Sequence, residues 1–284
     1  MKLSVKHLIA GILFLLSSAA FCSADVRFHF IAVGHGDAIL IEEEGMGIAL
    51  VDAGRPETAA NVLTYLNVLG INRIEHLFVT HTHDDHIGGI PAILDSLDIG
   101  IVHHTGMVDE WDTAETFFRY MATGNWLEET VGTGDVPLEM GNLKIEVLNP
   151  QLGETEGRSV DPNPNSLVLL VTHGEVKVLL TADIYKKRER WLVEKYGDYL
   201  CCDAMKASHH ASKMGNSKAL LQTVKPDVIV VSVGVSKWGY PAEKTMKRLR
   251  QFCPHVLRTD FVGTVVLQSD GISLIIRQPE GVNR

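Results

Sequence analysis

The sequence predicts an α/β domain in which two β-sheets carry helices on their outer faces. Short apolar runs typical of strands alternate with segments of helical periodicity along the chain. Polar and titratable residues follow strands in both halves, and no linker or repeat divides the sequence. With 45% apolar and 21% charged residues, the 284-residue chain can bury a large core. One domain is therefore the expected organisation.

Residues 1–24 are expected to be a secretory signal peptide rather than part of the fold. Two lysines precede a short apolar run, and small residues around Ala24 form a cleavage site. The run is too short and wrongly flanked for a stable membrane span. Cys22 suggests lipid attachment, but bulky Phe21 stands where such motifs need a small residue. Residues 25–284 are expected to form the mature exported domain, periplasmic or extracellular, with no membrane span.

The charge of the predicted mature chain argues against a general DNA-coating role. The formal net charge is −9 at pH 7, and loss of the signal peptide removes two lysines and no acid, which moves the charge to −11. An acidic protein repels phosphates at long range unless a basic patch or a bound metal inverts the local field.

Three cysteines remain after the predicted signal peptide. In an oxidising compartment, Cys201 or Cys202 can bridge to Cys253 and leave one free thiol. Their spacing is not that of a zinc knuckle. They are interpreted as small buried residues or as one disulfide.

The first half contains strands and helices in alternation. Val62, Leu66 and Leu69 share one face of a predicted helix that Gly70 ends. The predicted elements are, in chain order, strands at 37–45 and 47–54, a helix at 57–70, a buried strand at 74–80, a helix at 90–97, and a helix at 112–122 within a less regular region.

The second half repeats this alternation around a loop rich in proline and asparagine. The predicted elements are a strand at 142–150, the loop at 159–166, a hairpin at 167–183, a helix at 185–197, a short strand at 203–207, a helix, a strand at 226–234, a helix at 242–252 and two final strands.

Three histidines and two aspartates occupy five of the six positions 81–86, between a buried strand and a helix. Chemistry in α/β proteins is usually placed at such strand ends. In an extended loop His81 and His83 point the same way, while Asp85 and His86 follow a bend toward a second point. Imidazole and carboxylate suit zinc, and the set is too large for one cation. Two metals are predicted; a solvated surface loop is the weaker alternative.

The segment T-H-T-H-D-D-H-I-G-G at 80–89 resembles the signature of the metallo-β-lactamase superfamily. Other segments resemble further parts of that family in order, namely L-V-D-A-G at 50–54, L-L-T-A-D at 179–183 and S-H-H-A-S at 208–212. Within the superfamily, the sequence is most similar to the hydrolase domain of the DNA-uptake channel of competent bacteria and its free-standing secreted relatives. The matching segments span 28–268. The resemblance implies a four-layer αββα sandwich with the site at one edge between the sheets.

The resemblance also implies roles for individual residues. It implies that Asp183 bridges two metals and that His210 is the last ligand. It also implies that Asp52 supports the segment 81–86, named here the metal loop. His209 is then free to donate to substrate, although the sequence also allows the reverse assignment. The candidate ligands are thus His81, His83, Asp85, His86, Asp183 and His210, and the candidate catalytic residues are Asp85, His209 and Asp52.

The sequence departs from that subfamily's pattern at several positions. The subfamily usually has Gln at the position of His35, Gly at those of Ala182 and Ala211, and His at that of Tyr240. Tyr240 removes a polar contact at the rim that bears on substrate preference. His35, between two glycines, is a candidate to approach the site.

The superfamily usually supplies a third histidine to the first metal, and no histidine lies between residues 105 and 172. The first site then has an open position, which catalytic zinc requires. Asn165 either orients a ligand there or caps a turn. The basic run at 186–190 either attracts a polyanion or is the solvated face of a helix, and Lys213 is expected to be a solvated loop residue.

A dinuclear zinc hydrolase is the predicted function, with manganese as the other metal to consider. Two cations about 3.5–4 Å apart share a hydroxide and lower its pKa to about 7. The expected substrate is a phosphodiester, either nucleic acid or a phosphorylated surface group such as phosphocholine, and no obligate protein partner is indicated. Hydrolysis of β-lactams or of other esters and amides is one alternative, and the missing third histidine argues against the β-lactam reading. A non-catalytic, metal-stabilised binding module is the other.

Overall fold

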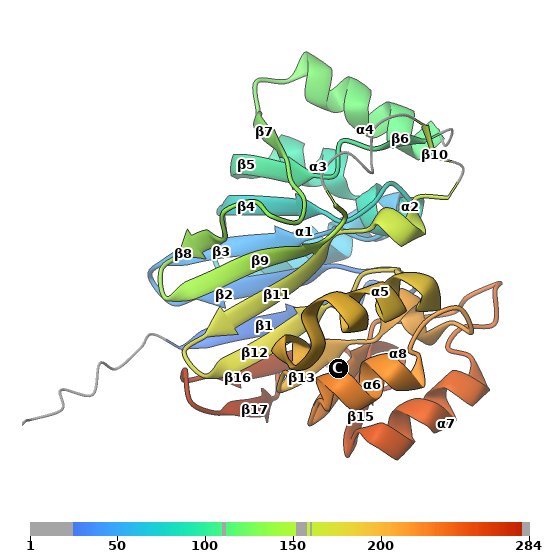
Figure 1. The fold of residues 1–284 in the computed structure, drawn as a ribbon. Coiled ribbons are helices and arrows are strands. Elements are labelled where there is room, and N and C mark those ends of the chain that lie inside the picture. The colour runs from blue at the N-terminus through green and yellow to red at the C-terminus, as the bar shows by residue number, and fades with distance from the viewer. Residues whose placement is uncertain (1–24, 110–111, 152–157, 160, 280–284) are drawn as a thin grey trace, which may run out of the picture.

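The computed structural model describes residues 25–109, 112–151, 158–159 and 161–279 (Figure 1). The predicted signal peptide lies outside these ranges. Within them, no helix has the length and apolar character needed to cross a bilayer.

The first sheet has eight strands in the spatial order β17-β16-β1-β2-β3-β4-β5-β7. Strands β3, β4 and β5 run parallel, so their carboxyl ends meet at one edge of the sheet. The strands are β1 Val26–Phe30, β2 Ile39–Glu43, β3 Gly47–Val51, β4 Arg73–Val79, β5 Asp98–His104, β7 Leu127–Thr130, β16 Val265–Ser269 and β17 Leu274–Arg277.

The second sheet has seven strands in the order β15-β14-β13-β12-β11-β9-β8, and its parallel part runs from β12 to β15. The strands are β8 Leu138–Met140, β9 Leu143–Asn149, β11 Val168–His173, β12 Val176–Leu180, β13 Ala204–Lys206, β14 Val228–Val231 and β15 His255–Arg258. A separate short pair joins β6 Val108–Asp109 to β10 Arg158–Ser159.

Helices cover the outer face of each sheet (Figure 1). Those on the first sheet are α1 Ala59–Val68, α3 Ile90–Ser96 and α4 Asp112–Thr123, and those on the second are α5 Lys186–Tyr196, α6 Lys218–Val224 and α7 Glu243–Phe252. Single turns form α2 Asp84–Ile87, α8 Thr259–Val262 and four 3-10 segments, η1 Pro56–Thr58, η2 Asn163–Asn165, η3 Gly197–Leu200 and η4 Ser208–Ala211.

Both faces of each sheet are buried, because alternate side chains of a strand point to opposite faces. In β2, Ile39 and Ile41 pack against the other sheet, whereas Leu40 packs against the helices. A third apolar cluster lies between the second sheet and its helices. Three apolar interfaces therefore separate four layers, which confirms the αββα sandwich.

Two local predictions were wrong. The chain ends with three strands rather than two, because β15 first joins β14 in the second sheet before β16 and β17 return to the first. Strand β5 was missed, since its polar first residue and two terminal histidines obscure the strand pattern. The bend expected after His83 is present, because α2 begins at Asp84.

The three cysteines of the described part have free thiols, so the predicted disulfide is absent. Cys202 and Cys253 are buried behind the second sheet, and Cys201 is exposed. The Cys202 thiol donates to the carbonyl oxygen of Ala204 at 3.0 Å. The interpretation as small buried residues holds for two of the three.

Candidate metal centre and pocket

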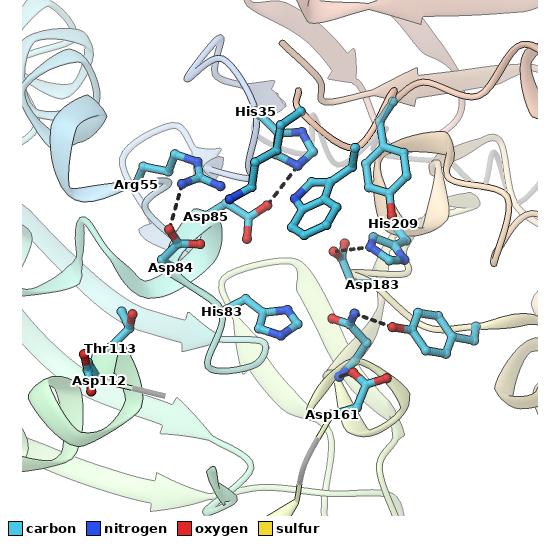
Figure 2. A pocket seen from close by; sticks show the side chains of 15 residues that line it. His35, Arg55, His83, Asp84, Asp85, Asp112, Thr113, Asp161, Asp183 and His209 are labelled. Carbon is cyan, nitrogen blue, oxygen red and sulfur yellow. Dashed lines mark hydrogen bonds and ion pairs between the residues drawn. The ribbon is translucent and has the colours of Figure 1, made fainter. Parts of the chain in front are cut away.

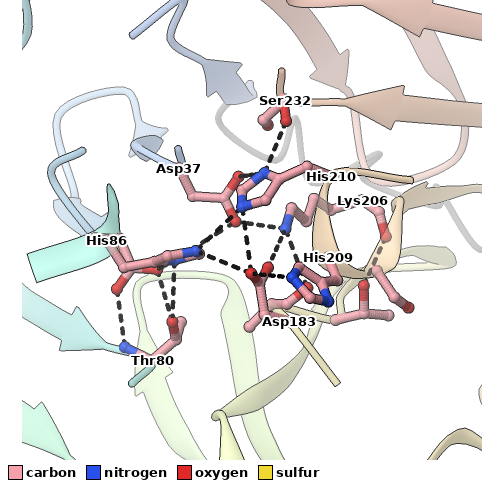
Figure 3. Close-up of polar contacts among 12 residues, drawn as sticks. Asp37, Thr80, His86, Asp183, Lys206, His209, His210 and Ser232 are labelled. Carbon is pink, nitrogen blue, oxygen red and sulfur yellow. Dashed lines mark hydrogen bonds and ion pairs between the residues drawn. The ribbon is translucent and has the colours of Figure 1, made fainter. Parts of the chain in front are cut away.

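The candidate ligands come together where the parallel strands of both sheets end. The segment after β4 supplies the 81–86 cluster, the turn after β12 supplies Asp183, and η4 after β13 supplies the two late histidines. The loop between β1 and β2 adds His35 and Asp37 from the first sheet (Figures 2 and 3). Residues far apart in the sequence thus meet at one sheet edge.

The carboxylate of Asp52 holds the metal loop in place. Its carboxylate accepts hydrogen bonds from the Thr80 backbone N–H at 2.8 Å and from the Thr80 hydroxyl at 2.7 Å. The same carboxylate lies 2.7 Å from His86 Nδ1, and the Thr80 oxygen lies 3.0 Å from His81 Nδ1. Burial raises the pKa of Asp52, although His86 opposes this. Both imidazoles are therefore held through Nδ1, which leaves Nε2 to face the site.

Four of these side chains form a set that fits a tetrahedral ion. His210 Nε2 lies 3.2 Å from Asp183 Oδ2 and 3.4 Å from Asp85 Oδ2. His86 Nε2 lies 3.4 Å from both Asp183 Oδ2 and His210 Nε2. Around tetrahedral zinc with bonds of 2.0–2.1 Å, ligand atoms are separated by about 3.3 Å. These four residues, named here the second subsite, fit that spacing.

His81 and His83 lie beside it and, together with Asp183, are named here the first subsite. His81 Nε2 lies 3.2 Å from His83 Nδ1, again a separation that one bound cation requires. His81, His86 and Asp183 each place a ligand atom within 4.8 Å of the others, so the two subsites adjoin. His81 is buried, whereas His83 is half-buried and lines the pocket. Three protein groups are therefore the candidates to hold a cation here.

The two late histidines diverge because of a left-handed turn, not because of the strand alternation that was expected. His209 and His210 both have φ of +50°, and Ala211 has +58°. His210 is fully buried, and its Nδ1 donates to the Ser232 carbonyl at 2.8 Å. His209 lines the pocket, with its Nε2 3.8 Å from Asp183 Oδ2 and its ring stacked on Tyr185. Residues with L side chains adopt this backbone only under local constraint.

The constraint on that turn comes from two buried residues that the sequence analysis missed. The Asn216 side chain bonds both backbone groups of Ser208, accepting from N–H at 3.0 Å and donating to the carbonyl at 2.8 Å. Glu189 in turn accepts the backbone N–H groups of Asn216 and Ser217. This clamp fixes the start of η4, and with it the directions of both imidazoles.

A buried lysine, also missed, lies behind the metal centre. Lys206 Nζ is 2.5 Å from Asp37 Oδ2 and 3.2 Å from Asp183 Oδ1, and it donates to the Ala182 carbonyl at 3.0 Å. Burial lowers the pKa of Lys206, but the two carboxylates outweigh this and raise it. Burial raises the pKa of Asp183, but His210, His86 and Lys206 hold it well below its usual range. The ammonium therefore occupies Oδ1 and leaves Oδ2 to the ligand histidines (Figure 3).

A pocket of about 530 Å³ opens over the ligands. Its wall carries five aspartates, one arginine and one lysine, together with three aromatic side chains, Tyr185, Trp238 and Tyr240 (Figure 2). Arg55 pairs with Asp84 at 2.7 Å, outside the ligand set. Burial and the neighbouring His210 lower the pKa of His35 to about 4, so this pocket imidazole is neutral at pH 7. The wall can contact a ligand by charge and by stacking.

A model of the metallo-beta-lactamase superfamily matches residues 31–235. The chain belongs to this superfamily. The resemblance that the histidine motif indicated is thereby confirmed.

The chain is similar to curated bacterial proteins, one of which is named a competence protein. ComE operon protein 3 of Bacillus subtilis is 26% identical over 89% of this chain and 34% of its own length. Competence protein ComA of Neisseria gonorrhoeae is 28% identical over 82% of this chain and 30% of its own length. The chain thus spans about a third of these relatives. The metallo-β-lactamase fold protein YhfI from Bacillus subtilis is 13% identical, with a TM-score of 0.57 over 87% of this chain and all of that one, which shows the shared fold.

Some residues that the sequence singled out lie away from the superfamily pocket. The Asn165 oxygen accepts from Arg188 at 3.2 Å, and the pocket wall contains its neighbour Asn163 instead. Lys213 is exposed. In the basic run at 186–190, Lys186, Lys187 and Arg190 are exposed as well. His29 is structural, with Nδ1 2.8 Å from the Tyr65 hydroxyl.

Proposed function

We propose that this chain is an exported dinuclear-metal phosphodiesterase. The observation that carries the proposal is the position of Asp183, whose Oδ2 lies 3.2 Å from His210 Nε2 while the same residue also adjoins His81, the neighbour of His83. A single carboxylate between two ligand sets is an arrangement suited to two adjacent cations.

The donor set suits zinc, because neutral imidazole and carboxylate are its usual ligands besides thiolate; manganese is the alternative that metal analysis decides. In the proposal, His81, His83 and Asp183 hold the first cation. Asp85, His86, His210 and Asp183 hold the second. When bound, two such cations activate water and polarise a phosphoryl oxygen.

The chain's own residues orient the reaction. Asp52 holds the His86 imidazole, and through Thr80 that of His81, so both present Nε2. His209 reaches the pocket with its ring fixed against Tyr185. Burial lowers the pKa of His209 more than Asp183 raises it, which favours a neutral imidazole. His209 is therefore proposed to donate a hydrogen bond to a substrate oxygen that gains charge.

The phosphodiester preference rests on the relatives and on the pocket wall. One relative is named a competence protein, and this favours nucleic acid. Trp238 and Tyr240 offer ring faces to bases, and Arg55 and Lys237 offer cations to phosphate. The same aromatic rings beside five aspartates would also suit a phosphodiester that carries a cationic group, such as phosphocholine.

One substrate panel tests the proposal. The metal-loaded protein is expected to hydrolyse bis(p-nitrophenyl) phosphate, to lose this activity with chelator and to regain it with zinc or manganese. Nitrocefin, a β-lactam, is the matched control and is expected to remain intact. Nitrocefin turnover would reassign the reaction, and bound metal without turnover of either compound would indicate a binding module.

Export is tested separately. If the signal peptide is cleaved after Ala24, the N-terminus of protein recovered from the periplasm or medium is Asp25. Recovery of the uncleaved chain inside the cell would contradict export and leave the metal chemistry untouched.

A further inference from the structure

His35 lies at the edge of the second subsite, although it belongs to the loop between β1 and β2 and not to the histidine motif at 81–86. Its Nε2 is 3.3 Å from Asp85 Oδ2, and its ring centroid is 4.5 Å from that of His210 (Figure 2). His35, Asp85 and His210 each offer a ligand atom within 4.8 Å of the others. We infer that His35 is an additional ligand of the second metal, an inference that rests on the proposed dinuclear site.

The backbone around His35 packs closely against the backbone of Asp85. Gly36 has φ of +142°, and a Cβ added there would lie 2.2 Å from the Asp85 carbonyl oxygen. On the other side, a Cβ added to Gly234 would lie 2.5 Å from the backbone of Gly34. The Asp37 backbone N–H also donates to the Asp85 carbonyl at 3.1 Å. Only glycine allows such close approach, so the loop cannot withdraw from the metal loop without losing these contacts.

The ring of His35 has one polar use among the described residues. Its Nδ1 is buried and has no hydrogen-bond partner there, although only 8% of the residue is exposed. Nε2 faces the carboxylate oxygen that also faces His210 Nε2 at 3.4 Å. A buried polar ring normally has its nitrogens satisfied. A cation bound between Nε2 and the Asp85 oxygen would be a ligand partner for the nitrogen that points into the site, and it would not satisfy Nδ1.

The ligand distances allow the addition. The 3.3 Å between His35 Nε2 and Asp85 Oδ2 equals the separation expected for two atoms on one zinc, about 3.3 Å. Catalytic zinc sites, unlike structural ones, sometimes expand from four ligands to five. His35 would thus give the second metal five protein ligands, whereas the first has three. The second cation would be the tighter-bound of the two, and substrate would approach the first.

The test compares His35→Gln with wild type by measurements that do not depend on turnover. The variant keeps the length and polarity of the side chain but replaces imidazole with a weak ligand. We expect the affinity of the second site for zinc, measured by competition with a chromophoric chelator, to fall at least 10- to 100-fold, on the order of effects seen at ligand-supporting positions. In the cobalt-loaded protein, the visible absorption should strengthen, because four-coordinate cobalt absorbs more strongly than five-coordinate cobalt. His29→Gln, a buried histidine on β1 outside the site, is the matched control.

The wild-type protein provides a check that needs no variant. With cadmium-113 bound and histidine labelled with nitrogen-15, each ligand imidazole shows coupling to the metal. Five coupled rings are expected, namely His35 and the four candidate ligands His81, His83, His86 and His210. Four coupled rings without His35, or unchanged affinity and spectrum in His35→Gln, would overturn the inference and make His35 a substrate contact. Lower affinity with an unchanged cobalt spectrum would also overturn it, since His35 would then only position Asp85. Wild-type protein that binds no metal would instead refute the dinuclear site itself.

Discussion

Lys206 and Asp183 form a fully buried ion pair, with Nζ 3.2 Å from Oδ1, directly behind the oxygen that faces the ligand histidines. The ammonium also lies 2.5 Å from Asp37 Oδ2, so one cation serves two buried carboxylates. Removal of one partner leaves the others charged and desolvated, and that is more costly than loss of a surface pair.

Lys206→Met is therefore expected to destabilise the metal-free protein by about 3–5 kcal/mol. The measurement is urea unfolding of the chelated protein. The exposed Lys213→Met is the control and should change the free energy of unfolding little. The double variant Lys206→Met/Asp37→Asn should recover part of the loss, because one of the two stranded charges is gone. Equal stabilities of Lys206→Met and Lys213→Met would show that the ammonium is not required.

Asp183→Ala is expected to lose more metal and more activity than Asn165→Ala. Asp183 adjoins both ligand sets, whereas Asn165 is bonded to Arg188 and lies off the pocket wall. Metal content after gel filtration, beside turnover of bis(p-nitrophenyl) phosphate, provides the comparison. Equal metal content in the two variants would mean that Asp183 does not bridge.

Asp52→Asn should weaken zinc binding about 10- to 100-fold, although Asp52 does not line the pocket. The amide keeps the volume but loses the charge that holds His86 Nδ1 at 2.7 Å. Asp84→Asn is the matched control, because Asp84 stands in the same motif, pairs with Arg55 and lies outside the candidate ligand set. Chelator competition measures both variants. Similar affinities for the two would exclude a supporting role specific to Asp52.

His103 predicts a pH-dependent part of the stability away from the metal centre. Burial, followed by the neighbouring His76 and His104, lowers its pKa from 6.5 to about 4. Below pH 6.5, His103 binds a proton in the unfolded chain, whereas in the folded chain it stays neutral until about pH 4. Stability therefore falls as the pH falls through this window. The contribution is at most about 3 kcal/mol.

The slope is measured by urea unfolding of the chelated protein at several pH values between 7 and 4. His103→Gln should show a smaller loss of stability across the window than wild type. Exposed His255→Gln should keep the wild-type slope. A slope unchanged by His103→Gln would show that other groups account for it.

The sequence was informative where the chemistry is contiguous. His81, His83, Asp85 and His86 lie within six positions after an apolar strand, and the structure places them together at the predicted sheet edge. The outer helices and the two-sheet arrangement also follow from local periodicity, as α1 and the β11–β12 hairpin illustrate.

What sequence reasoning missed depends on burial between distant segments. The sequence around Lys206 gives only a weak indication of burial, because its partners Asp37 and Asp183 come from other loops. An isolated lysine in a short apolar strand beside a histidine pair was the available signal. The left-handed turn at His209 and His210 was likewise unpredictable, since Glu189 and Asn216 that hold it lie on other segments. The alternation of side chains along a strand predicted that the two rings diverge. The rings do diverge, but the left-handed turn is the reason.

Those two histidines provide the most direct separation of binding from catalysis. His210 is fully buried, its Nδ1 is committed to the Ser232 carbonyl, and its Nε2 lies within ligand distance of Asp183 and Asp85. His210→Ala should therefore lower the occupancy of the second site together with activity. His209 lines the pocket with Nε2 3.8 Å from Asp183, and its ring centroid is 6.1 Å from that of His210.

His209→Ala should keep both metals and lower kcat about 10²-fold, as expected when a donor to a developing negative charge is removed. Metal stoichiometry and kcat are measured on the same preparations of both variants, with unfolding curves to verify the fold. His209→Gln retains a hydrogen-bond donor and should recover part of the rate. If His209→Ala loses a metal while His210→Ala keeps both, the roles are reversed. In that case the left-handed turn directs the first of the two imidazoles, not the second, to the metal.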